Sequence, residues 1–157
     1  MQEPDRFDRA ILAILQRDNR TPQRRIAEEV GLSAPAVQRR IRRMEAEGVI
    51  TANVALVAPE ALGRALTIIV EVALESESAE LLDAAKRAFS AAPEVQQCYY
   101  VTGEVDFVLL LTLRSMAEYE AFTRRVFFAD ANLRFFRTLV VMDRVRAGLD
   151  MPVAPAP

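Results

Sequence analysis

The spacing of apolar residues changes along the chain, and this change divides the sequence into two parts. Up to Gly48, apolar residues recur every three or four positions, which is the period of an amphipathic helix. From Ala65 onwards, aliphatic and β-branched runs alternate with helical stretches, as in a protein that mixes strands and helices. A chain of 157 residues has room for two small domains. We therefore expect an α+β protein with a helical N-terminal domain.

Three helices are expected in the first fifty residues. The first covers residues 8–17. Thr21 is expected to cap the second helix, ahead of a proline at its first position. Ser33 is expected to cap the third, which continues to Gly48. The second and third helices are joined by about three residues that include Gly31, which is typical of a helix-turn-helix.

Basic residues are concentrated in this region, although the whole chain has a net charge of −2. Seven arginines and two glutamates lie between Arg20 and Arg43. The segment that forms the second and third helices is therefore strongly cationic, as expected of a surface that binds nucleic acid.

The exposed face of the third helix predicts contacts with double-stranded DNA. In a helix-turn-helix this helix enters the major groove, and its N-terminal residues read base edges. Gln38 and Arg39 are placed to do so, while Ser33 can offer its hydroxyl and helix-end amides to a phosphate. Further contacts, mainly to phosphates, are predicted for Arg24, Arg25, Arg40, Arg42 and Arg43. Alternatively, these arginines only solvate an exposed helix, with Glu45 and Glu47 as partners.

The second part of the chain has the order of elements of a ferredoxin-like domain. Strands are expected over 66–74, 95–102, 105–113 and 133–145, and helices over 78–91 and 116–127. The order βαββαβ predicts an antiparallel sheet with both helices on one face. The predicted domains are 1–50 for the helix-turn-helix, 51–64 for a linker strand, 65–147 for the ferredoxin-like domain and 148–157 for a flexible tail.

Two of the predicted strands are apolar on both faces, which has a consequence for assembly. Residues 107–111 and 139–142 contain almost only aliphatic side chains. Two helices cover one side of such a sheet, so the other side is expected to pack against a second copy of the chain. The alternative is a monomer in which both strands are tightly buried.

The segment 101–107 predicts a small-molecule site. Gly103 permits a tight turn whose backbone amides can face an anion. Glu104 and Asp106 place two carboxylates beside it. Amide donors and acidic acceptors together suit a zwitterion, with its ammonium group on Asp106. An acidic hairpin turn without a ligand is the alternative.

Composition excludes several classes of enzyme. The chain has no histidine, no tryptophan and one cysteine, Cys98, which rules out a histidine base, a Cys-His pair and an internal disulfide. We expect no enzyme activity, no cofactor and no metal site. Apolar stretches are far shorter than the roughly 20 residues of a membrane span, and the N-terminus lacks a signal-peptide core. A cytoplasmic location away from the membrane is therefore expected.

Seven motifs resemble those of the Lrp/AsnC (leucine-responsive regulator/asparagine regulator) family of transcription factors. They are DRAIL (8–12), LQRD (15–18), VGLS (30–33), VQRRIRRME (37–45), GVI (48–50), CYYVTGEVDF (98–107) and RTLVVM (137–142). The resemblance covers about residues 5–146. It implies a winged helix-turn-helix, dimerisation through the sheets, further assembly to tetramers or octamers, and a response to amino acids.

The resemblance also implies an effector site between subunits. The positions that match the family's site are Tyr100, Gly103, Glu104, Val105, Asp106, Met116, Thr138, Leu139 and Val140. Glu104 stands where aspartate is commonest, and Tyr100 where a smaller aliphatic residue is frequent, so the walls of this pocket differ from the family pattern.

The preferred function is therefore a sequence-specific, DNA-binding transcriptional regulator that a small amino-acid-like effector modulates. The alternative is a ferredoxin-like small-molecule-binding or enzymatic protein whose N-terminal helices bind a protein partner.

Overall fold

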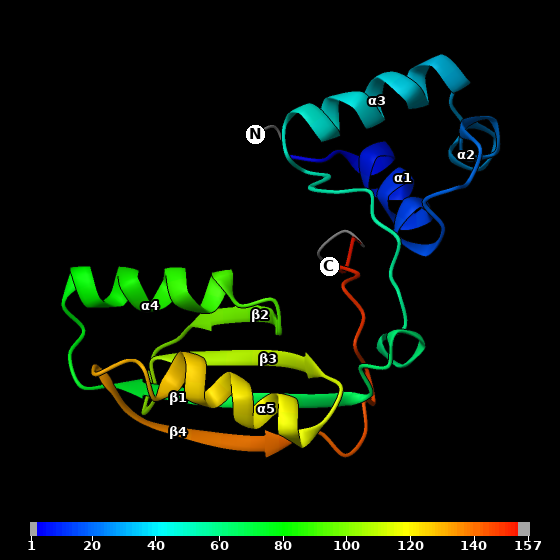
Figure 1. Ribbon diagram of the computed structural model, residues 1–157. Coiled ribbons are helices and arrows are strands. Elements are labelled where there is room, and N and C mark those ends of the chain that lie inside the picture. Colours follow the sequence, from blue (N-terminus) through cyan, green and yellow to red (C-terminus); the bar gives the residue numbers. More distant parts are fainter. Residues whose placement is uncertain (1–2, 154–157) are drawn as a thin grey trace. The chain divides into compact units, whose positions relative to one another are not determined.

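The computed structural model describes residues 3–153 and divides into two compact units (Figure 1). The helical unit consists of Met1–Leu56 with Arg146–Pro157, and the sheet unit of Val57–Val145. Residues 154–157 of the predicted tail lie outside the described residues. The described part of the tail contacts α1 of the helical unit: the side-chain amide of Gln16 bonds both the backbone nitrogen (2.6 Å) and the carbonyl oxygen (3.0 Å) of Met151. The predicted domain limits stay a prediction.

The helical unit contains the three expected helices, α1 (Arg6–Arg17), α2 (Gln23–Val30) and α3 (Ala34–Ala46). One apolar stripe from each helix meets in the core, which contains Ile11, Ile14, Ile26, Ala27, Val37 and Met44. This core fixes α3 with its opposite face turned outward.

The helix caps differ in part from those expected. Helix α1 begins two residues earlier because Asp5 caps it, accepting hydrogen bonds from the amides of Phe7 (2.8 Å) and Asp8 (2.9 Å). The expected Thr21 cap of α2 is wrong, since its hydroxyl donates to the Asp18 carbonyl. The Ser33 cap of α3 is confirmed by a 3.3 Å bond from the Ala36 amide.

The predicted linker strand does not form in the described chain. Residues 51–58 are neither helix nor strand, and a short 3₁₀ helix, η1 (Pro59–Leu62), follows. The side chains of Val54, Leu56 and Val57 are exposed. A β-branched run needs a neighbouring strand to bond with, and this segment has none in the single chain.

The sheet unit has the predicted order βαββαβ. Its elements are β1 (Leu66–Leu74), α4 (Ala79–Ala91), β2 (Val95–Tyr100), β3 (Phe107–Leu113), α5 (Met116–Phe122) with a π turn, η2 (Thr123–Phe127), and β4 (Leu133–Val140). The strands lie in the order β2-β3-β1-β4, and all neighbours are antiparallel. The ferredoxin-like prediction is confirmed, although β4 ends five residues earlier than expected.

Both helices of the sheet unit cover the same face of the sheet. Alternate residues of β1 and β3 pack in one cluster with side chains from α4 and α5, including Ala85, Phe89, Tyr119 and Phe122. Two other apolar side chains of these helices, Leu81 and Met116, lie outside this core and are 40% and 53% exposed. Leu81 lies beside the stripe formed by Leu82, Ala85 and Phe89, and Met116 is the first residue of its helix, so neither points at the sheet.

The other face of the sheet is left uncovered within the described chain. Directly paired residues point to the same side, so Leu110, Ile69 and Leu139 form one row across this face. The next row contains Glu71 and Arg137, joined by an ion pair of 3.3 Å. Leu139 remains 43% exposed. Of the helices in the described residues, none is long and apolar enough to cross a membrane.

Candidate nucleic-acid interface and effector site

The outward face of α3 carries unpaired arginines. Val37 and Met44 point into the core, so Arg39 and Arg42 lie on the opposite side of the helix and are exposed. Within the described residues, neither forms an ion pair, and neither does the exposed Arg25 of α2. These guanidinium groups are therefore available to an external anion.

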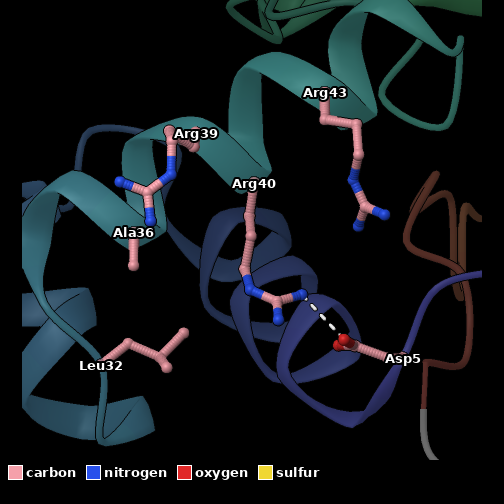
Figure 2. A pocket seen from close by; sticks show the side chains of 6 residues that line it. All are labelled: Asp5, Leu32, Ala36, Arg39, Arg40 and Arg43. Carbon is pink, nitrogen blue, oxygen red and sulfur yellow. Dashed lines mark hydrogen bonds and ion pairs between the residues drawn. The ribbon is translucent and has the colours of Figure 1, made fainter.

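Arg40 and Arg43 of the same helix are turned back toward α1. Arg40 Nη1 lies 2.8 Å from Asp8 Oδ1, and Arg43 Nη2 lies 2.5 Å from Asp8 Oδ2. Arg40 Nη1 also lies 2.8 Å from Asp5 Oδ2, the contact drawn in Figure 2. Arg40 further stacks over the ring of Phe7, 5.4 Å from its centre. Helix α3 therefore presents two classes of arginine, one free and one engaged.

Charge and hydrogen bonding favour the ionised forms of Asp5 and Arg40. The pKa of Asp5 is lowered, chiefly by the hydrogen bond from the Asp8 amide and further by Arg40, against an opposing effect of burial. The hydrogen bond to Asp8 raises the pKa of Arg40 above its ordinary value. An open hollow of about 430 Å³ lies beside the cluster (Figure 2), lined by Asp5, Leu32, Ala36, Arg39, Arg40 and Arg43. Its charged lining is predominantly cationic.

The remaining predicted DNA contacts lie at the surface of the helical unit. Ser33 is exposed at the start of α3, Gln38 is half-buried, and Arg24 forms an exposed pair of 3.4 Å with Glu28. Their roles in DNA binding stay predictions. The pairing of Arg40 and Arg43 with Asp8 was not predicted from the sequence. Asp5 and Asp8 are three residues apart ahead of an apolar run, which is a capping signature, so the sequence did indicate that both acids lie at the start of α1.

The glycine-acid turn is tied to the end of β1. Gly103 has φ +131°, a conformation that favours glycine. Asp106 Oδ2 accepts a 2.7 Å hydrogen bond from the Leu74 amide, and the Asp106 amide donates to the Val72 carbonyl. In the described chain no hydrogen bond to Asp106 Oδ1 is found. One carboxylate oxygen therefore shapes the turn, and the other is available to a ligand.

Tyr100 stands at the same end of the sheet as this turn. Its hydroxyl donates to Glu77 at 3.0 Å, which raises the pKa of Tyr100, and its ring lies 5.4 Å from that of Phe107. Lys86 lies over the ring, 5.1 Å from its centre. Glu77 and Lys86 were not predicted, because only the fold brings them to Tyr100. Glu104 is exposed and Val105 is half-buried.

A single chain does not assemble all the predicted effector residues. Leu139 pairs with Ile69 on β1, whereas Phe107, next to the turn, pairs with Val72. Leu139 is therefore several residues along the sheet and two strands across from the turn, about 15 Å away. Thr138 faces α5, where its hydroxyl contacts that of Tyr119 at 2.5 Å. The predicted effector residues therefore form two groups. Thr138, Leu139 and Val140 of β4 and Met116 of α5 make up the group that lies away from the turn.

Two family descriptions match these two units. Residues 4–51 match a winged helix-turn-helix DNA-binding domain, and residues 67–149 match the Lrp/AsnC ligand binding domain. Together with the folds, they define a DNA-binding transcriptional regulator that carries a ligand-binding domain.

Known proteins are similar over nearly the whole chain. The HTH-type transcriptional regulator y4tD of Sinorhizobium fredii is 46% identical over 151 residues, which cover 96% of this chain and 89% of that protein. The crystal structure of an AsnC family transcriptional regulator from Agrobacterium tumefaciens has a TM-score of 0.89 at 34% identity, covering 95% of this chain and 97% of that one. A feast or famine regulatory protein from Mycobacterium tuberculosis, complexed with L-methionine, has a TM-score of 0.84 at 30% identity, covering 95% and 99%. The chain belongs to the Lrp/AsnC family, which confirms the resemblance.

Proposed function

We propose that the protein regulates transcription by laying the outer face of α3 in the DNA major groove. Gln38 and Arg39 read base edges, while Arg42 and Arg25 bind phosphates. Ser33 and Arg24 add backbone contacts. The observation that carries this proposal is the exposure of Arg39 and Arg42 without an acidic partner in the described chain.

The salt dependence of DNA binding tests this proposal. Replacing both Arg39→Gln and Arg42→Gln removes one base contact and one phosphate contact, and the lost phosphate contact no longer releases counterions. The slope of log affinity against log salt is expected to become less steep by about 1, and the affinity to fall on the order of 100-fold or more. The measurement is fluorescence anisotropy with a labelled duplex, enriched from genomic DNA by the wild-type protein.

The matched control changes two arginines of the sheet unit. Arg87 and Arg124 are exposed on α4 and in the π turn. Their double replacement with glutamine alters the net charge equally and is expected to leave the slope unchanged. An unaltered slope in the Arg39/Arg42 variant would contradict the proposal.

An amino acid is the proposed effector, bound where the glycine-acid turn of one subunit meets β4 and α5 of another. The free oxygen of Asp106 accepts the ammonium group, and the amides around Gly103 face the carboxylate. Two observations support this: the predicted residues are split within one chain, and a relative has been solved with L-methionine. Tyr100 and Glu104 line the same site.

Thermal unfolding with each of the twenty amino acids tests the effector site. A binder is expected to raise Tm, with the shift growing with its concentration. Asp106→Asn keeps an acceptor for the Leu74 amide but removes the charge, so the shift is expected to disappear. Glu80→Gln, an exposed neutralisation on α4, is the control and should retain it. The effector is not an amino acid if no shift occurs with any of the twenty.

The proposed partner in assembly is a second copy, docked on the uncovered sheet face. This face carries both an acid and a base, Glu71 and Arg137, so it can be complementary to a two-fold related copy of itself. We further propose that dimers assemble into tetramers or octamers. The protein acts in the cytoplasm, away from the membrane, and has no catalytic activity.

A further inference from the structure

We propose that Asp8 is a specificity-determining residue of the DNA-binding function, although it does not touch DNA. It holds Arg40 and Arg43 against α1 and so decides which arginines of α3 reach the duplex. The inference rests on the proposed DNA-binding face of α3, and its test separates the two.

The contacts of Asp8 leave little freedom to the two arginines. The Asp8 side chain is 1% exposed, and each of its oxygens accepts from a different guanidinium of α3, at 2.8 Å and 2.5 Å. Oδ2 also accepts from the Asp5 amide at 3.1 Å. Charge-assisted bonds to a buried acid are stronger than those at the surface, so Arg40 and Arg43 stay turned inward.

Position along α3 explains why this matters for DNA. Arg39 and Arg42 are the two arginines of α3 without an acidic partner in the described chain. Arg40 directly follows Arg39 in the sequence, and Arg43 directly follows Arg42. Without an acid beneath them, all four cations would be available along one side of the helix. Phosphate contacts add affinity for any sequence, whereas base contacts discriminate between sequences. Withholding two arginines therefore lowers non-specific binding.

Asp8 stabilises α1 by completing its capping box with the Asp5 amide, but a neutral side-chain amide can fill that role equally well. A buried ion pair commonly contributes no more to stability than apolar side chains of similar volume. The consequence particular to a carboxylate here is the direction it imposes on two recognition-helix arginines, which is a property of DNA binding.

The salt dependence of non-specific binding tests the inference. Asp8→Asn keeps the shape of the side chain but removes the charge that Arg40 and Arg43 share, so that Arg40 keeps only its pair with Asp5. On a 24-base-pair duplex of mixed sequence, the slope of log affinity against log salt is expected to steepen by about 1 to 2. Loosening of the helical unit alone would weaken binding and would not steepen the slope. An unchanged slope in folded Asp8→Asn protein overturns the inference.

Glu29→Gln is the matched control for net charge. Glu29 is exposed in the same unit and pairs at 3.2 Å with Arg17, which is also exposed and lies on α1. This variant is expected to keep the wild-type slope. A slope as steep as that of Asp8→Asn would show that net charge alone is responsible, which also overturns the inference.

A triple variant keeps the test valid if Asp8→Asn fails to fold. Combining Asp8→Asn with Arg40→Gln and Arg43→Gln replaces the buried acid and both of its arginine partners with neutral hydrogen-bonding groups, so no buried charge is left without a partner. Asp5 stays charged, but its side chain is half exposed. Because Arg40 and Arg43 make no native contact with DNA in this proposal, the wild-type slope is expected. A slope less steep by about 2 would show that they bind phosphates in the native protein and would overturn it.

The Arg39/Arg42 variant separates failure of this inference from failure of the proposed function. If that variant keeps the wild-type slope, the proposed DNA-binding face is wrong. If it loses slope while Asp8→Asn gains none, the face is right and the role of Asp8 is wrong.

Discussion

Leu139→Asp is expected to make the protein monomeric by weakening dimerisation more than about 100-fold. Leu139 lies in the row with Ile69 and Leu110 on the uncovered face of the sheet. In a two-fold dimer each substitution counts twice, so two carboxylates would be desolvated among aliphatic side chains. Even about 1.4 kcal/mol for each gives two factors of ten in the dissociation constant. Sedimentation equilibrium across a concentration series measures the change.

Leu81→Asp is the matched control for this variant. Leu81 has nearly the same exposure as Leu139, 40% against 43%, but lies on α4, on the helical side of the sheet. It is expected to leave dimerisation unchanged. If Leu139→Asp and Leu81→Asp weaken dimerisation equally, the interface does not lie specifically on the uncovered sheet face. If both variants remain dimeric, the proposed sheet-to-sheet assembly is wrong. Both side chains are partly solvated in the single chain, so neither substitution is expected to unfold it.

The elements were predictable because their signals are local. Strand β1 was expected over the residues that form it, because a nine-residue β-branched run has one reasonable interpretation. The start of α1 was missed because the apolar stripe begins after the cap, so Asp5 and the first two residues of the helix were left outside the expected range. A helix boundary depends on one or two side-chain bonds, which periodicity does not report.

The direction of individual side chains was not predictable in the same way. Arg39 and Arg40 are neighbours of the same type, but Asp8, 32 positions before Arg40, binds Arg40 and not Arg39. That choice depends on how α1 packs against α3. The effector residues were likewise predicted from the sequence as the members of one site. Only the strand register shows that Leu139 lies far from Gly103 within a single chain.

Phe107→Ala is expected to destabilise the sheet unit by about 3–5 kcal/mol. The ring is fully buried, packs edge-to-face on Phe89 at 5.2 Å, and lies 5.4 Å from Tyr100. Its removal leaves a cavity between the sheet and α4 that the rigid strands cannot close. Small domains are stable by only about 5–15 kcal/mol, so the loss is a large fraction of the total.

Tyrosine fluorescence during urea unfolding measures this loss in the sheet unit alone. The chain has no tryptophan and three tyrosines, and all three, Tyr99, Tyr100 and Tyr119, lie in the sheet unit. Phe128→Ala is the control, because that ring is 70% exposed and its loss is expected to cost less than about 1 kcal/mol. A difference between the two variants below about 1 kcal/mol would mean that Phe107 does not hold α4 on the sheet.

A loss of about 3–5 kcal/mol in the sheet unit would also loosen the adjoining Asp106, whose carboxylate is bonded to β1. Phe107→Ala should therefore abolish any amino-acid-induced Tm shift that Phe128→Ala retains.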